Sequence, residues 1–198
     1  MSRSPRPTTD RLSTRSLLII AAFGALGALL LVLVAPVTSV LAAVFAPAYA
    51  AVAGLHSVLP FLARRLVGFP WTTTIASALV GILAVGFPPL GVLIVVPLVV
   101  TGVGFDLTLL LLARRGPLRL GHQVVGALVT AGLLTLVSVP VLSPRDASAP
   151  FLVLFLVGRV VGQLAAVAIA VAIGDRVLRS GIVRPSVGDG GGPAGTSA

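Results

Sequence analysis

One stretch of the chain, residues 91–115, combines a long apolar run, a single acid inside that run and two arginines at its end. About 20 apolar residues, each rising about 1.5 Å along a helix, cross the roughly 30 Å hydrocarbon core of a bilayer. Asp106 is the only charged residue before Arg114 and Arg115. Arginines at the end of a span mark the cytoplasmic side, because cationic loops remain there. The stretch therefore predicts a membrane-spanning helix, its orientation and one buried acid.

The composition of the whole chain agrees with a membrane protein. Hydrophobic residues make up 57% of the sequence and charged residues only 10%, whereas a soluble domain carries about 25% charged residues. The net charge of +9 comes from arginines in the tails and in short hydrophilic breaks, where membrane topology explains them better than nucleic-acid binding. The absence of cysteine excludes disulfides and thiolate metal sites. We predict an all-α, multi-pass protein of the bacterial plasma membrane, with no nucleic-acid partner, metal or cofactor.

Six apolar segments are long enough, or nearly so, to cross the membrane. Pro36 is expected to break the chain after the first of them. The second contains Pro47 and Pro60, which predict either a kink or a short re-entrant piece followed by a full helix. The third is short for a span. The predicted helices cover residues 16–34, 37–63, 72–86, 91–113, 122–141 and 150–173.

The arginines set the predicted topology. They collect in the N-terminal arm and after the second, fourth and sixth segments, whereas the other breaks contain only Arg145. The positive-inside rule then places both termini in the cytoplasm. We expect a flexible arm at residues 1–15, a six-helix membrane domain at 16–180 and a disordered tail at 181–198. A cleaved signal peptide is the alternative for the N-terminal region, but its apolar part is too long and no hydrophilic mature domain follows.

Few polar side chains lie inside the predicted spans, and they are the candidate functional residues. A charge at the bilayer centre costs about 2.5 to 3.5 kcal/mol on insertion scales, so each one implies a partner or a polar cavity. Arg159 and Gln163 share one helix face, where they would bind an anionic or electron-rich ligand from the outside. The other candidate ligand contacts are Tyr49, Thr135 and Ser138.

The alternative for these polar side chains is a polar lock, in which they fix neighbouring helices rather than bind a ligand. Asp106 lies roughly 22 Å into its span and Arg159 roughly 13 Å into its own, with Gln163 one turn deeper. A chain from Arg159 through Gln163 to Asp106 is therefore sterically possible. For Asp106 and His56 the lock or simple packing is the favoured interpretation.

Small residues form a stripe on the first predicted helix. Ala21, Gly24, Ala25 and Ala28 follow the spacing i, i+3, i+4 and i+7. In lipid such a stripe lets another helix approach closely, so it indicates either docking of a separate subunit or packing within this chain. The sequence contains no P-loop, zinc-protease or Ser/His/Asp motif, so we predict no enzymatic activity.

The chain resembles the substrate-binding S components of energy-coupling-factor (ECF) transporters, in its length, its six helices and the stripe Ala21, Ala25 and Ala28. The resemblance implies docking of that stripe on a transmembrane coupling subunit, driven by two cytoplasmic ATPase subunits, and binding of a vitamin or precursor near the outer face. The region 64–115 resembles S components linked with thiamine or its hydroxymethylpyrimidine precursor. It has a Gly/Pro turn, then Gly102, Gly104 and Asp106, and then a basic pair.

The sequence departs from that pattern, because Asp106 stands where Glu is more usual and aromatic residues are few. Two other functions remain open at this point. The chain could be a self-sufficient permease or channel, which would transport its substrate without partners. It could also be a structural or assembly factor, which would bind no small molecule.

Overall fold

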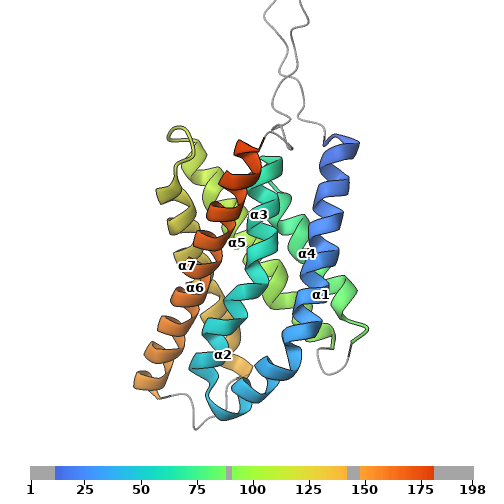
Figure 1. Cartoon of the computed structure of the whole chain (residues 1–198). Helices are drawn as coiled ribbons and strands as arrows, with labels where there is room; N and C mark the ends of the chain where they lie inside the picture. Colours follow the sequence, from blue (N-terminus) through green and yellow to red (C-terminus); the bar gives the residue numbers. More distant parts are fainter. Residues whose placement is uncertain (1–11, 88–90, 142–147, 181–198) are drawn as a thin grey trace, which may run out of the picture.

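A computed structural model describes residues 12–87, 91–141 and 148–180 of the chain. Within these ranges every regular element is a helix (Figure 1). The elements are α1 (Thr14–Val44), α2 (Ala46–Ala53), the 3-10 turn η1 (Gly54–Ser57), α3 (Val58–Val67), α4 (Thr72–Ala84), the 3-10 turn η2 (Val92–Ile94), α5 (Val95–Ala113), α6 (Leu120–Ser138), the 3-10 turn η3 (Val139–Val141) and α7 (Ala149–Arg179).

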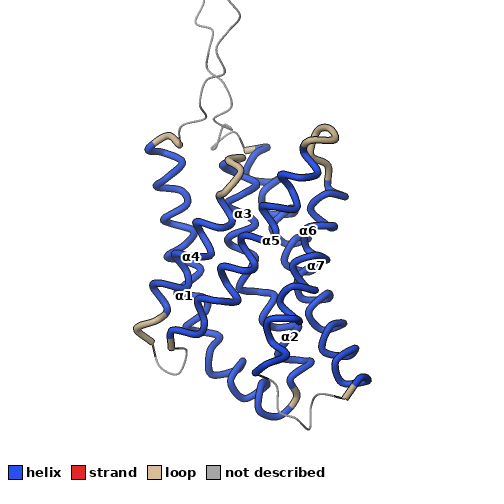
Figure 2. The backbone as a smooth tube through the Cα atoms, turned by 180° about the vertical axis from the view of Figure 1, so that it is seen from behind, coloured by secondary structure: helices blue, strands red, loops and turns tan. Residues whose placement is uncertain are grey.

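These elements make six passages through one bundle, which confirms the predicted all-α class. Five passages in the described part of the chain are long and apolar enough to span a membrane, and α4 is shorter at 13 residues. The second passage, Ala46–Val67, consists of α2, η1 and α3 in succession. The start of α1 and the end of α7 lie at the same end of the bundle, as an even number of passages requires (Figures 1 and 2). The side of the membrane that this end faces stays a prediction.

The predicted break at Pro36 is wrong, because α1 continues through this proline to Val44. Transmembrane helices tolerate proline where nearby hydroxyl groups satisfy the disturbed backbone. Thr38 Oγ1 lies close by and donates to the carbonyl of Ala35 at 3.0 Å, although the carbonyl that loses its donor at Pro36 is that of Val32. The chain turns at Phe45 instead, and Pro47 lies in the first turn of α2, where its missing N–H is not needed.

The interruption predicted in the second passage is present, but not at a proline. It lies at η1, and Pro60 is accommodated in the first turn of α3. The last helix, α7, also runs beyond the predicted end at residue 173, to Arg179. Of the predicted arm only residues 12–15 are described, and the predicted tail at 181–198 lies outside the described residues.

Two sets of helix contacts organise the bundle. On one side α4 packs between α1 and α5, and on the other α7 packs against α2, α3 and α6. The stacked rings of Phe61 in α3 and Phe105 in α5, whose centres are 4.1 Å apart, belong to the largest apolar cluster. These packed helices also carry the polar side chains of the candidate functional site.

Candidate functional site

A cavity lies between the second passage, α5, α6 and α7, in the half of the bundle remote from the chain ends. About 330 Å³ of space between these elements is free of atoms, and this volume includes space that is open to the outside. Its wall contains both apolar and polar side chains. Its lining residues are Tyr49, Ala53, His56, Ser57, Ile94, Pro97, Leu98, Thr101, Leu134, Arg159 and Gln163. We call it the Arg159 cavity.

Arg159 projects from α7 into this cavity, and only 5% of the residue is exposed. Its guanidinium carbon lies 5.4 Å from the ring centre of Tyr49 and 5.3 Å from that of Phe155. Its Nη2 donates a hydrogen bond of 3.3 Å to Ser138 Oγ. Aromatic faces and a hydroxyl stabilise a buried cation, but none of these partners carries a formal negative charge.

Gln163 lies one turn further along α7 and is 1% exposed. Its Nε2 donates to Ser57 Oγ at 3.1 Å. Its Oε1, the Nε of Arg159 and the Nε2 of His56 are all buried, and none has a hydrogen-bond partner in the described part of the chain. Buried polar atoms are rarely left unpaired, because each costs the desolvation energy of the group. These three side chains are therefore suited to binding a polar ligand.

Glycines bring the η1 turn against α7 and so place its side chains in the cavity. A Cβ atom on Gly54 would lie only 2.5 Å from the Cα atom of Gly162, so the two backbones touch. Small residues permit such close approach of helices in lipid. The contact positions His56 and Ser57, which belong to η1, beside Gln163.

The structure brings together four of the five predicted ligand contacts, Arg159, Gln163, Tyr49 and Ser138. Thr135 is not among the lining residues, and its hydroxyl donates to the carbonyl of Ala131 in its own helix. His56, predicted to lock helices together with Asp106, lies in the Arg159 cavity instead.

Sequence reasoning missed two polar lining residues, Ser57 and Thr101. Ser57 directly follows His56 in the sequence. The signal that could have found it is the sequence Gly54-Leu-His-Ser57 in the middle of a span, because polar residues beside a glycine mark an interruption.

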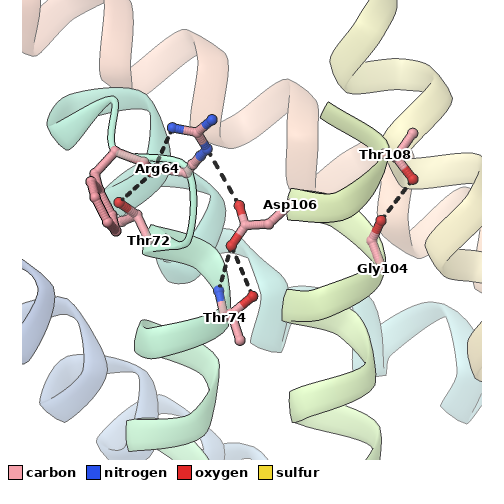
Figure 3. A network of polar contacts seen from close by, with 7 residues as sticks. Arg64, Thr72, Thr74, Gly104, Asp106 and Thr108 are labelled. Atoms are coloured by element: carbon pink, nitrogen blue, oxygen red, sulfur yellow. Dashed lines mark hydrogen bonds and ion pairs between the residues drawn. The ribbon is translucent and has the colours of Figure 1, made fainter. Parts of the chain in front are cut away.

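Asp106 forms a second polar centre with Arg64 and Thr74 (Figure 3). Arg64 lies near the end of α3 and Thr74 near the start of α4, so this centre is in the half of the bundle that contains both chain ends. The carboxylate is 0% exposed, and its Oδ1 lies 3.3 Å from Arg64 Nε. Its Oδ2 accepts bonds from the backbone N–H of Thr74 at 2.8 Å and from Thr74 Oγ1 at 2.9 Å. Because Thr74 lies in the first turn of α4, the carboxylate satisfies a free N–H group at a helix N-terminus. We call this the Arg64–Asp106 centre.

The chain from Arg159 through Gln163 to Asp106, which the helix depths allowed, does not form among the described residues, because Gln163 bonds to Ser57 and Asp106 to Arg64 and Thr74. Arg64 was predicted to mark the cytoplasmic end of the second segment, but α3 remains helical past it to Val67, and the residue is buried in the bundle with 9% of its surface exposed. Its Nη1 also donates to the carbonyl of Phe69 at 2.6 Å. Gly102, one turn before Asp106, lets α4 approach, since a Cβ atom there would lie 2.6 Å from the Cα atom of Thr74.

A further cavity, with about 610 Å³ of empty space, borders the Arg64–Asp106 centre. Its two arginines, Arg64 and Arg65, each already hold a carboxylate of the chain. Arg65 donates from Nε to Asp175 Oδ1 at 3.0 Å and so joins α3 to α7. Within the described part of the chain no group of three His, Cys, Asp or Glu side chains could hold a metal ion.

The stripe of small residues on α1 divides between two faces. Gly24 and Ala28 are buried, and a Cβ atom on Gly24 would lie 2.8 Å from the Cβ atom of Leu79 in α4. Ala21 and Ala25 are exposed on the outer face of the bundle. With about 3.6 residues per turn the four positions cover about 100° of the helix surface, and the boundary between the buried and the exposed side of α1 runs through the middle of the stripe.

The fold is similar to that in a crystal structure of an S-component of an ECF transporter. The two chains superpose with a TM-score of 0.77 over 87% of this chain and 88% of that chain, at 19% sequence identity. No protein-family model matches the sequence, and no curated protein is significantly similar to it. The comparison shows that this chain has the fold of that S-component.

Proposed function

We propose that this chain is the membrane-embedded substrate-binding subunit of an ECF-type importer for a small nutrient. The observation that carries the proposal is the Arg159 cavity, a partly open polar pocket within a bundle that has the S-component fold. Fold alone does not define function, but a concave pocket with converging polar groups is the expected form of a ligand site. With both chain ends in the cytoplasm, the cavity lies in the outer half of the membrane.

Transport in this proposal depends on partners. The exposed residues Ala21 and Ala25 of α1 form the docking surface for a transmembrane coupling subunit, while the buried Gly24 and Ala28 hold α1 against α4. Two cytoplasmic ATPase subunits supply the hydrolysis, so this chain is not itself an enzyme. Different affinities of the loaded and empty states for the coupling subunit drive the cycle.

Reconstitution into liposomes tests this dependence on partners. Uptake of labelled nutrient is measured with the chain alone and with the chain together with a coupling subunit and two ATPases. We expect uptake only in the complete assembly and only with ATP. Uptake by the chain alone would show a self-sufficient permease, and a chain that binds no small molecule would be an assembly factor.

The docking surface has its own test. Ala25→Leu places a bulky side chain on the exposed face of α1, and we expect uptake by the complete assembly to fall at least about tenfold while ligand binding is unchanged, because close helix contact is lost. Ala42→Leu is the matched control, since Ala42 is also exposed on α1 but lies almost five turns away. Lost ligand binding in Ala25→Leu, or equal loss of uptake in both variants, would count against docking at Ala25.

The ligand suggested by the sequence resemblance is thiamine or its hydroxymethylpyrimidine precursor. Both can be tested directly by the change in the thermal midpoint of the purified chain in detergent. Ligand binding to the folded state raises this midpoint by an amount that increases with the logarithm of the ligand concentration divided by Kd.

A further inference from the structure

The ionisable groups around the Arg159 cavity are unevenly distributed. The described lining residues include two with basic side chains, Arg159 and His56, and none with a carboxylate. A guanidinium group remains charged at any physiological pH. The cavity therefore presents a permanent positive charge to whatever occupies it.

The carboxylates of the described residues are already used elsewhere in the bundle. Asp106 is held by Arg64 and Thr74, and Asp175 by Arg65. The other three acids of the chain, Asp10, Asp146 and Asp189, lie outside the described residues. In the described part of the chain Arg159 therefore has aromatic and hydroxyl partners, but no counterion.

The unpaired atoms of the cavity indicate what a ligand must provide. Arg159 Nε is a hydrogen-bond donor and Gln163 Oε1 an acceptor, and both are buried without a partner in the described residues. An oxyanion can accept two parallel hydrogen bonds from a guanidinium group, and this is the strongest pairing available to an arginine side chain. A hydrogen-bond donor elsewhere on the ligand would satisfy the Oε1 atom of Gln163.

We infer that the ligand of the Arg159 cavity is an acid, which pairs a carboxylate or another oxyanion with Arg159 and donates a hydrogen bond to Gln163. This inference rests on the proposed function and selects among its ligands. It disfavours thiamine, because a cationic ring would face the buried guanidinium group. It also disfavours the hydroxymethylpyrimidine precursor, which has no negative charge.

The test separates small molecules by charge. A bacterial small-molecule extract is divided by ion exchange into acidic, neutral and cationic pools, and each pool is added to the purified full chain in detergent. We expect the acidic pool to raise Tm by roughly 5 °C, as binding well above Kd does for a chain of this size. Arg159→Gln should lose this shift. Arg179→Gln should keep it, because Arg179 is exposed at the far end of α7.

Each other outcome overturns a defined part of the inference. A shift caused by the neutral or cationic pool, or a shift that persists in Arg159→Gln, would show that the ligand is not an acid held by Arg159. A cationic shift that disappears in Asp146→Asn would show that Asp146 binds the ligand, and would also overturn the inference. If no pool raises Tm, both the inference and the proposed function fail. If an acid binds but the chain transports it without partners, only the proposed function fails.

Discussion

Two buried arginines, Arg64 and Arg159, lie in opposite halves of the same bundle and are held in different ways. Arg64 pairs with a fully buried carboxylate and donates to the backbone of Phe69. Arg159 lies between two aromatic rings and a serine hydroxyl. Burial is therefore similar, but only Arg64 has its charge balanced by a described residue. This difference in partners, rather than any difference in depth, is the reason why we assign a structural role to Arg64 and propose a binding role for Arg159.

The two regions also join different parts of the bundle. The Arg64–Asp106 centre connects α3, α4 and α5, and its carboxylate caps the first turn of α4. The Arg159 cavity lies between the second passage, α5, α6 and α7, where close glycine contacts bring η1 against α7. We expect substitutions in the first region to act mainly on folding and those in the second mainly on ligand binding.

Asp106→Asn should have the largest effect on stability. Removing one partner of a buried ion pair leaves the other charge unbalanced, which costs about 3 to 5 kcal/mol of unfolding free energy. The measurement is denaturant unfolding in detergent. The double variant Arg64→Met with Asp106→Leu should recover much of the loss, since it leaves no unpaired charge. A fully stable Asp106→Asn would contradict the structural role of the pair.

Gly162→Ala should disturb both stability and binding. The added Cβ atom would clash with the carbonyl oxygen of Ala51 and lie 3.0 Å from its carbonyl carbon, and such overpacking costs about 1 to 3 kcal/mol. It should also displace η1 and weaken ligand binding. Gly132→Ala in α6 is the control, because a Cβ atom there meets nothing within 4 Å. Equal behaviour of the two variants in unfolding and binding measurements would argue against the backbone contact.

Thr74→Val should have a smaller effect. It removes the hydroxyl that donates to Asp106 but retains the backbone N–H bond to the same oxygen, so we expect a loss of about 1 kcal/mol. Thr108→Val is the matched control, since the hydroxyl of Thr108 donates to the carbonyl of Gly104 in its own helix (Figure 3). Unfolding in detergent compares the two. A loss in Thr108→Val as large as that in Thr74→Val would assign no special role to the bond with Asp106.

Arg159→Gln should have the smallest effect on the stability of the ligand-free protein. No described carboxylate loses its partner, so we expect the unfolding free energy to change by less than about 1 kcal/mol. Arg64→Gln, measured in the same way, should lose several times more because Asp106 is left buried and unpaired. A similar loss in both variants would show that Arg159 also has a structural counterion, and the distinction between the two arginines would fail.

The sequence predicted the passages well because a bilayer restricts a chain so strongly. Without water to satisfy the backbone, each long apolar run must be helical. The positions of prolines predicted the ends of the helices less well. Pro36 was expected to end a helix but lies within α1, whereas Pro47 begins α2. A proline removes a single hydrogen bond of the helix, and the surrounding structure decides whether the helix continues.

The sequence by itself determined that the chain folds in a lipid bilayer rather than in water and that it is helical. It also identified the few polar side chains that the membrane interior must accommodate. It also placed Arg159 and Gln163 on one face, because one helical turn separates them. Only the tertiary structure decided that Asp106 pairs with Arg64, that His56 joins the cavity, and that Ala25 is exposed while Gly24 is buried. Such pairings depend on the rotation and close approach of helices from distant parts of the chain, which periodicity within one helix does not specify.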